Sequence, residues 1–530
     1  MKNTILIFIT SILITLSSCF DDKGNYDYSN PEENVISNIE GEYNLMAYKD
    51  TLKIVPDFKG INENENTTYL WTIYSMASKD EDDQIDYEKL SNIIADTISE
   101  ERNLNYAIFL SNGSYRLNYE VKDGLTGLVS FFTTYLNVST EFSKGFYLLK
   151  ETSEGNSEID VYTVENSLLE NLLANISGTT LKGSPLSFGM WPLYSYLNTE
   201  TQENDVHDFL LPITKDGELA MIRIEDFKKI RDFDDMFYDD EDKGRPLMAF
   251  PNCESYGFNT TKGYFRNSQV SSVGMLSSGY FGNTLVPEDE PTNYEFNSLG
   301  CLYGKGTLLY DKLYNRFMAI DYRSGNIHAF SDENSSYSMN NIEDEIIYIG
   351  GGSVGSSNYA YGIFNIKGSN QKRIYAIGDL DLKKYTNTVD AVIDIPLDAA
   401  MTNANLFACS KQAAELIYFV SDNKIYTYKS YSQTEDELTI EGLPQDEEIT
   451  YIDNIFTSNS GDANFDYLIV GTYKDGNYSV YMYNTMGGIP VGGPQKTVKG
   501  KGKIAKIQYM NIGINNDEED RLDNLYSVQF

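Results

Sequence analysis

Apolar and polar positions alternate strictly between residues 115 and 122. The apolar positions are Tyr115, Leu117, Tyr119 and Val121. A period of two residues indicates a β-strand with one buried face and one wet face. The turn signal Asp123-Gly124 follows, and the apolar segment 128–138 then predicts a returning strand.

Strand-like segments also precede this hairpin, at residues 51–58 and 68–74. The second segment contains Trp71, and an aromatic side chain of this kind can lie buried between the sheets of a β-sandwich. An acidic and weakly helical stretch at residues 79–102 interrupts the pattern, which predicts a surface insertion. Together these segments predict a β-sandwich with an acidic insertion over residues 36–141.

A unit of two apolar strands around a polar turn recurs about seven times after residue 145. The copies lie at residues 147–162, 210–224, 256–266, 317–330, 360–377, 416–428 and 467–483. A four-stranded propeller blade takes about 40–50 residues, and a closed ring of blades leaves no exposed sheet edge. The repeat therefore predicts a seven-bladed β-propeller over residues 142–530. Stacked sandwiches also fit these strands and turns, so both architectures stay open.

Two local patterns lie within the same region. Ser167 and Glu170 have the spacing of a capping box, which predicts a short helix that ends near Gly178. The glycine-rich run 350–355 follows a predicted strand but lacks the lysine and the helix of a phosphate-binding loop. We expect this run to be a flexible loop between blades.

A lysine and an apolar run over residues 5–16 open the chain, a pattern typical of a signal peptide. The run is shorter than the roughly 20 residues of a transmembrane helix. The segment Leu16-Ser17-Ser18-Cys19 follows and resembles the bacterial lipoprotein signal. The resemblance implies that residues 1–18 are removed and that the Cys19 thiol carries an acyl anchor such as palmitate. An ordinary signal peptide with a chance cysteine is the alternative.

Residues 19–35 are polar and contain glycine and proline, which predicts a flexible tether. Asp21 and Asp22 lie just after the lipidated position, and their placement resembles the acidic export signal of Bacteroidetes lipoproteins. The resemblance implies display on the outer face of the outer membrane, whereas a solvated acidic tether is the alternative. No later apolar run is long enough to cross a membrane, so we expect the lipid alone to hold the protein there.

The composition disfavours several functions. The chain carries 41 basic and 79 acidic residues, a net charge of −38, whereas nucleic-acid binders are basic. His207 and His328 are the only histidines, which nearly excludes histidine-dependent metal or triad chemistry. Cys253, Cys301 and Cys409 have neither zinc-ligand spacing nor a disulfide framework, so we expect small buried side chains. We therefore expect no cofactor, no metal and no catalytic residue.

Two clusters are candidate sites. The acidic run 232–242 offers oxygen atoms of the kind that bind calcium, but its spacing departs from a calcium loop and Lys243 follows it. A solvated acidic loop is the favoured interpretation. Trp191, Tyr194 and Tyr196 are close in sequence, and such aromatic rings can stack on a sugar or anchor a peptide. The same residue types also fill protein cores.

Residues 69–73 and 113–123 resemble the polycystic-kidney-disease (PKD) type of immunoglobulin-like domain. The tether and the segment 145–150 are similar to the PKD-like lipoproteins of Bacteroidetes. The resemblance implies an accessory subunit beside a TonB-dependent transporter and its lid-like nutrient-binding lipoprotein, with a peptide or a glycan as the ligand. It brings no catalytic motif, so we expect no enzyme. A surface hydrolase or lyase that uses propeller carboxylates or tyrosines, and a purely structural spacer, are the alternatives.

Overall fold

The computed structural model describes most of the chain between residues 34 and 511. The described ranges are 34–47, 49–75, 96–108, 110, 113–142, 144–178, 180–199, 202, 204–252, 255–268, 278–303, 306–321, 325–333, 335–354, 357–378, 385–413, 415–457 and 464–511. Cys19, Asp21, Asp22 and Cys253 lie outside these ranges, as does the acidic stretch 79–83. Within the described ranges, no helix has the length and apolar character to pass through a membrane.

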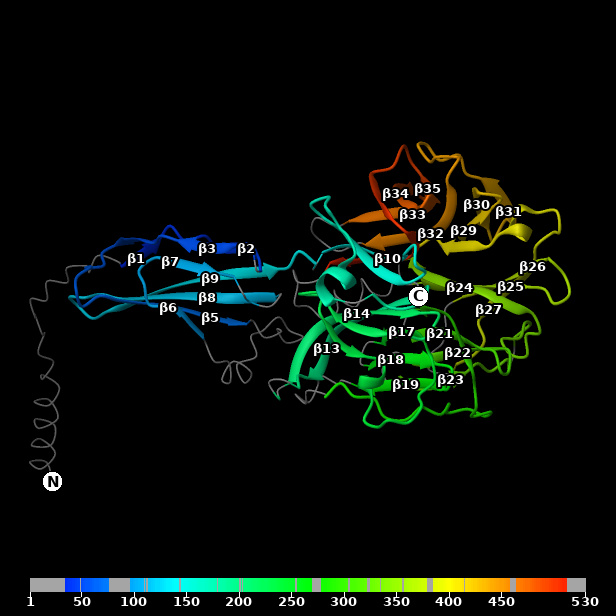
Figure 1. Cartoon of the computed structure of the whole chain (residues 1–530), viewed down its shortest axis with the longest axis horizontal. Coiled ribbons are helices and arrows are strands. Elements are labelled where there is room, and N and C mark those ends of the chain that lie inside the picture. Colours follow the sequence, from blue (N-terminus) through cyan, green and yellow to red (C-terminus); the bar gives the residue numbers. More distant parts are fainter. Residues whose placement is uncertain are drawn as a thin grey trace, which may run out of the picture.

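The first nine strands form a β-sandwich, drawn in blue to cyan in Figure 1. They are β1 (Val35–Ser37), β2 (Glu42–Met46), β3 (Thr51–Ile54), β4 (Asp57–Lys59), β5 (Thr68–Ser75), β6 (Asp96–Ser99), β7 (Leu104–Ala107), β8 (Gly113–Lys122) and β9 (Val129–Ser139). A sheet with the order β2-β9-β8-β5-β6 shares one core with the small sheets β3-β7 and β1-β4.

Trp71 lies at the centre of this core and is fully buried. Its ring stacks on Tyr119, with the two ring centroids 3.9 Å apart. The indole Nε1 donates a hydrogen bond to the carbonyl oxygen of Glu101 at 3.0 Å. Leu117 and Val121 are also buried, as the alternating pattern predicts. The prediction that Trp71 is buried between sheets is confirmed.

The segment after the acidic stretch differs from the prediction. Residues 96–99 belong to the predicted helical insertion, but they form strand β6 and pair with β5 beside Trp71. Thr97 and Ile98 are β-branched, and such side chains favour an extended backbone. Pairing with an existing strand therefore outweighs a weak helical pattern.

Asp123 organises the turn between β8 and β9. Its carboxylate accepts hydrogen bonds from the backbone N–H groups of Asn62, Thr126 and Leu125 at 2.6, 2.7 and 2.9 Å. These bonds lower the pKa of Asp123, the one from Asn62 most strongly, because they stabilise the ionised form. The carboxylate thus holds two loops of the sandwich together.

We expect the sandwich to lose stability in acid through Asp123. Because the folded state lowers its pKa, Asp123 stabilises the fold above about pH 4, the pKa of an unfolded aspartate, and this stability disappears as the pH falls through the folded value. Urea unfolding at a series of pH values should show a smaller loss in acid for Asp123→Asn than for wild type. Glu120→Gln, on the wet face of β8, is the control, and an unchanged pH dependence in Asp123→Asn would contradict this role.

From Lys144 onward, the described residues form seven further sheets. Their strands are β10 (Lys144–Glu151), β11 (Ser157–Thr163), β12 (Leu168–Leu169), β13 (Pro185–Leu197), β14 (Asn204–Thr214), β15 (Ala220–Arg223), β16 (Lys229–Asp232), β17 (Pro246–Asn252), β18 (Ser255–Thr260), β19 (Gly263–Ser268), β20 (Phe296–Tyr303), β21 (Gly306–Asp311), β22 (Arg316–Asp321), β23 (Ile327–Ala329), β24 (Glu345–Val354), β25 (Ser357–Asn365), β26 (Lys372–Ile377), β27 (Val389–Asp394), β28 (Leu406–Cys409), β29 (Leu416–Ser421), β30 (Lys424–Lys429), β31 (Thr434–Glu437), β32 (Glu448–Thr457), β33 (Phe465–Lys474), β34 (Asn477–Met486), β35 (Ile489–Pro490), β36 (Lys496–Lys501) and β37 (Lys503–Asn511).

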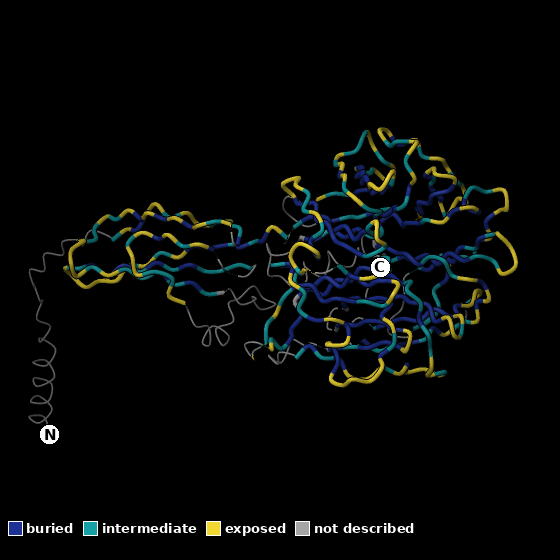
Figure 2. Tube along the Cα trace, viewed as in Figure 1, coloured by how far each residue is buried: buried dark blue, intermediate teal, exposed yellow. Residues whose placement is uncertain are grey.

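The innermost strands of these sheets form a closed ring. In order they are β37, β13, β17, β20, β24, β28 and β32; each contacts the next, and β32 contacts β37. A ring of radially arranged sheets is a β-propeller. The all-β fold with a sandwich followed by a propeller is confirmed, and stacked sandwiches are not formed. Figure 2 shows the buried backbone along the strands and the exposed backbone at their turns.

Each predicted hairpin lies in a different sheet of the ring. The pairs are β10–β11, β14–β15, β18–β19, β22–β23, β25–β26, β29–β30 and β33–β34. Turn chemistry explains why sequence reveals them: Asp475 and Gly476 both have positive φ, as the two-residue turns of tight hairpins require.

The first sheet of the ring is completed by β37, the last strand among the described residues. β37 pairs antiparallel with β10, from Lys144 opposite Asn511 to Glu151 opposite Lys503. Ile504, Ile507 and Met510 of β37 are buried against neighbouring sheets. The ring is therefore closed by hydrogen bonds between the two ends of the propeller.

The predicted capping box is wrong. Leu168 and Leu169, inside the proposed box, form strand β12, and a single π-helical turn spans Leu173–Ser177. The buried carboxylate of Glu158 accepts hydrogen bonds from the N–H groups of Leu173 and Ala174, so a strand residue caps this helix. The helix does end at Gly178, whose φ of 74° suits a glycine.

The glycine run 350–355 is not a loop as far as it is described. Residues 350–354 continue strand β24 and pair with β25. A Cβ on Gly351 would approach the carbonyl oxygen of Tyr359 to 2.6 Å. Glycine here permits a close approach of two strands, which a local sequence pattern does not distinguish from flexibility.

The two ends of the sheets form opposite faces of the propeller. The innermost strand β20 begins beside the hairpin turn 312–315, because Phe296 pairs with Asp311. Likewise, β24 begins beside the hairpin turn 366–371, because Glu345 pairs with Asn365. We call this end the hairpin face. β10 begins at the other end, where Lys144 pairs with the last residue of β37. We call that end the linker face, because the chain from the sandwich arrives there.

Candidate functional site

A pocket of about 730 Å³ opens on the hairpin face between the sheets β20–β23 and β24–β27. We call it the inter-blade pocket. Its amide and hydroxyl side chains are Asn297, Asn315, Asn365, Asn370, Asn403, Ser369, Thr402 and Tyr310, and its charged side chains are Lys312, Lys367, Lys372, Glu343, Asp344 and Glu345. The lining is thus polar, with a balanced number of acids and lysines.

Three connections shape the pocket. Asn315 ends the turn between β21 and β22 with a φ of 51°, and its carbonyl oxygen accepts a hydrogen bond from Ile342 N–H at 2.8 Å. This bond ties the approach to β24 against the turn. The turn after β25 forms the opposite wall, and Thr402 and Asn403 come from the 3-10 helix Ala400–Asn403 of the next sheet.

Most of the pocket carboxylates have cationic or amide partners. Asp344 binds the Arg373 guanidinium at 2.6 Å and accepts a hydrogen bond from Lys367 N–H at 3.0 Å. Arg373 also binds Asp394 at 2.5 Å, and this hydrogen bond is the main cause of its raised pKa. Glu343 lies 3.6 Å from the Lys367 ammonium. Arg373 and Lys367 therefore compensate the negative charges of Asp344 and Glu343.

Lys372 is the buried cation of the pocket, with 6% of its surface exposed. Its Nζ donates a hydrogen bond to the side-chain oxygen of Asn365 at 3.1 Å. Burial lowers its pKa, because desolvation disfavours the charged form.

Two smaller pockets flank the turn 312–315 between β21 and β22. One, of about 380 Å³, shares Asn297 and Lys312 with the inter-blade pocket. The other, of about 540 Å³, lies beside Tyr314 and Arg316 and is lined by acidic residues such as Asp289. The turn 312–315 therefore contributes residues to three pockets on the hairpin face.

The predicted aromatic site is wrong, because Trp191, Tyr194 and Tyr196 are buried. Trp191 stacks on Tyr194 with ring centroids 4.7 Å apart and packs among Phe258 and Phe281 between two sheets. The Tyr194 hydroxyl donates to the carbonyl oxygen of Gly279 at 2.9 Å. The alternative interpretation as core residues holds.

The acidic run 232–242 is balanced by nearby lysines. Lys243 binds Asp239 at 2.5 Å, Lys262 binds Asp242 at 2.6 Å and Lys229 binds Asp232 at 3.0 Å. No group of three or more potential metal ligands was found among the described residues. The three ion pairs favour a solvated, ion-paired loop, which is the interpretation preferred from the sequence.

Cys301 and Cys409 are buried free thiols. Burial raises the pKa of Cys301 to about 12 and that of Cys409 to about 11, so both stay protonated at neutral pH. His328 stacks on Tyr385 with a centroid distance of 3.7 Å. These residues pack as structural side chains.

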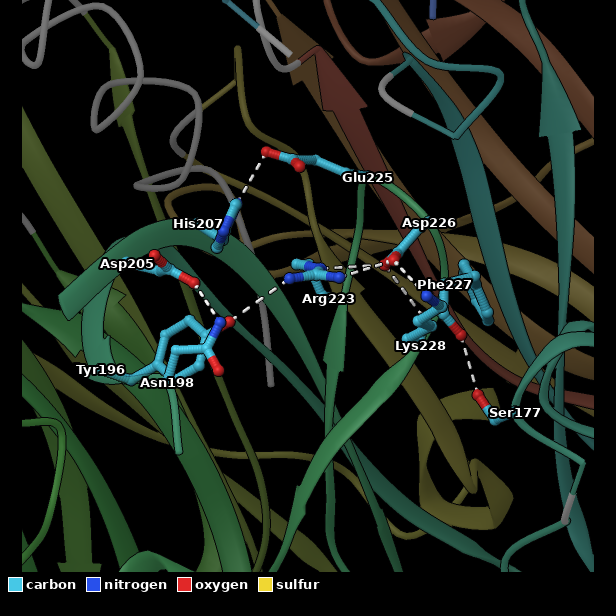
Figure 3. A network of polar contacts seen from close by, with 10 residues as sticks. All are labelled: Ser177, Tyr196, Asn198, Asp205, His207, Arg223, Glu225, Asp226, Phe227 and Lys228. Atoms are coloured by element: carbon cyan, nitrogen blue, oxygen red, sulfur yellow. Dashed lines mark hydrogen bonds and ion pairs between the residues drawn. The ribbon is translucent and has the colours of Figure 1, made fainter. Parts of the chain in front are cut away.

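A second polar network lies on the linker face and is shown in Figure 3. Arg223 binds Asp226 through two hydrogen bonds of 2.9 and 2.6 Å, and His207 Nδ1 lies 2.8 Å from Glu225. The contacts fix the turn that carries Phe227, which packs against Phe142 of the linker at a centroid distance of 5.5 Å. The network therefore supports the joint between sandwich and propeller.

The N-terminal third of the chain is similar to a known family. Residues 19–185 match the model of the PKD-like family. The match covers the sandwich and continues through β12 to the start of β13, so the predicted resemblance to the PKD-like family is confirmed for this part of the chain, whereas the lipoprotein resemblance stays a prediction. No curated protein sequence matches the chain.

Several solved structures are also similar to the chain at low sequence identity. A quinonprotein alcohol dehydrogenase-like protein from Bacteroides thetaiotaomicron is 14% identical, with a TM-score of 0.37 over 91% of this chain and 99% of that chain. The extracellular domain of a one-component system from the same organism is 11% identical, with a TM-score of 0.34 over 89% and 70% of the two chains. BamB from Moraxella catarrhalis is 10% identical, with a TM-score of 0.29 over 60% and 92%.

Sequence reasoning missed the inter-blade pocket. It predicted the hairpin 360–377, whose turn forms one wall, but much of the facing wall comes from the preceding sheet, about one repeat earlier in the chain. The polar turn Lys367-Gly368-Ser369-Asn370 is the one local signal, and every hairpin of the chain carries a similar turn.

Proposed function

We propose that the protein is a lipid-anchored binding protein on the outer face of the outer membrane. In this proposal it is an accessory subunit of a TonB-dependent uptake system and works beside the transporter and its lid-like lipoprotein. The acyl anchor on Cys19, the export signal at Asp21 and Asp22 and these partners follow from the sequence resemblance. The ligand, a glycan in preference to a peptide, occupies the inter-blade pocket.

The observation that carries the proposal is the position of the pocket relative to the sandwich, which follows the predicted tether in the chain. The pocket opens on the hairpin face, whereas the sandwich joins the linker face through Phe142. Figure 1 shows the sandwich to one side of the propeller. With Cys19 in the membrane, the sandwich spaces the propeller from the lipid and the pocket faces outward.

The lining supports a glycan as the ligand. Amide and hydroxyl side chains both donate and accept hydrogen bonds, which suits the hydroxyl groups of a sugar. Ile346 and Ile366 are the aliphatic side chains of the pocket, which leaves little apolar surface for a peptide side chain.

Filling the pocket should weaken ligand binding. Ser369→Trp places an indole at an exposed turn of the pocket, so we expect at least about tenfold weaker binding of oligosaccharides in calorimetric titration. Ser432→Trp, at an exposed turn on the linker face, is the matched control and should bind as wild type does. Equal affinity of the two variants would place the ligand elsewhere.

The cellular part of the proposal has its own test. Protease added to intact cells should degrade the protein, and purification of the native protein should bring a TonB-dependent transporter with it. Protection from protease, or mass spectrometry that finds Cys19 without lipid, would overturn the proposed location.

A further inference from the structure

Lys372 differs from the other lysines that are buried in the described part of the chain. These lysines are Lys150, Lys243, Lys372 and Lys411. Lys150 binds Asp160 at 2.7 Å and Lys243 binds Asp239 at 2.5 Å. Lys411 is stabilised by the nearby charge of Asp453. Each of these three ammonium groups thus has an acidic neighbour.

No described carboxylate lies within 4 Å of the Lys372 ammonium, whose described hydrogen bond goes to the neutral Asn365. The lowered pKa of Lys372 has desolvation as its cause, without a charge that opposes it. A buried charge without a counter-charge costs free energy. The cost falls when an anion arrives, and the Lys372 side chain lines a pocket that is large enough to receive one.

We propose that the inter-blade pocket recognises a carboxylate on its ligand, through the ammonium group of Lys372. This inference rests on the proposed function and specifies its ligand as a glycan that contains uronic acid or another carboxylated sugar. The amide side chain of Asn365 positions the ammonium, and the neighbouring Asn and Ser side chains bind the sugar hydroxyls. Asp344 does not compete for Lys372, because Arg373 holds it at 2.6 Å.

The test compares three probes on the full-length protein. They are an oligosaccharide of uronic acids, the same oligosaccharide with its carboxyl groups methyl-esterified, and an acidic peptide of similar length. We expect the free acid to bind at least about tenfold more tightly than the ester, the difference that a hydrogen bond to a charged group supplies. The acidic peptide should bind more weakly than the acidic glycan.

Lys372→Met removes the ammonium and keeps the aliphatic stem. It should lose the preference for the acid over the ester, whereas Lys429→Met, which changes an exposed lysine outside the pocket, should keep it. A readout without ligand is the thermal unfolding midpoint, which should be unchanged or higher in Lys372→Met because an uncompensated buried charge is gone.

The outcomes separate this inference from the proposed function. Equal binding of acid and ester, with Ser369→Trp still blocking both, would overturn the carboxylate preference and leave the pocket as the binding site. A preference that persists in Lys372→Met would overturn the role of that residue. Tighter binding of the acidic peptide, lost in Lys372→Met, would overturn the glycan as the source of the carboxylate. Binding of no glycan or peptide would overturn both proposals.

Discussion

A chain that ends at Gly502 is expected not to form the propeller. Such a chain lacks β37, so β10 loses its antiparallel partner and the ring of innermost strands has a gap between β13 and β32. The buried side chains of Ile504, Ile507 and Met510 are lost as well, and each removes a large apolar contribution to stability. Circular dichroism and hydrogen exchange should show loss of cooperative unfolding and of protection in β10 and β11.

Supplying the missing strand separately distinguishes ring closure from a general effect of truncation. A synthetic peptide of residues 503–530 should restore protection in β10 when it is added during refolding. The same peptide with Ile507→Asp should fail, because it places a charge at a buried position. A truncated chain that unfolds with the cooperativity of wild type would contradict closure by β37.

The second large effect is expected at the ion pair of Lys150 and Asp160. Both side chains are buried, and the ammonium lies 2.7 Å from the carboxylate. Asp160 also accepts hydrogen bonds from the Tyr478 hydroxyl at 2.7 Å and from Asn171 N–H at 2.8 Å. Tyr478 belongs to the neighbouring sheet, so one carboxylate joins the first and last sheets of the ring.

Asp160→Asn should destabilise the propeller by about 3–5 kcal/mol, because it removes the carboxylate that pairs directly with the buried Lys150 ammonium. Urea unfolding measures the loss, and hydrogen exchange in β10 and β34 locates it. Asp446→Asn breaks an ion pair with Lys474 of 2.5 Å that is exposed to solvent, and this control should change stability little. A similar effect of the two substitutions would show that burial of the Lys150 pair does not matter.

The same physics explains the contrast between Lys150 and Lys372. Each ammonium is removed from water, but Lys150 receives a carboxylate from the fold and Lys372 does not. In the first arrangement the fold itself supplies the opposite charge. In the second arrangement the Lys372 ammonium has no carboxylate partner from the fold, and in our proposal a carboxylate of the ligand supplies one.

The sequence by itself determined the local elements of this protein. The alternation from Tyr115 to Val121 predicted a strand and its buried face, and the turn residues predicted a hairpin in each sheet of the propeller, because strand period and turn φ angles are properties of adjacent residues. The apolar run before Cys19 likewise supports a prediction of export.

Only the tertiary structure decided what these elements meet. Trp191 is a core residue because a neighbouring sheet covers it, and the run 350–354 is a strand because β25 lies beside it. The closing strand and the inter-blade pocket bring together residues far apart in the chain, as between Lys144 and Asn511. Burial and pairing depend on such distant partners. A local pattern indicates which face of a strand is apolar, but it does not indicate which element covers that face.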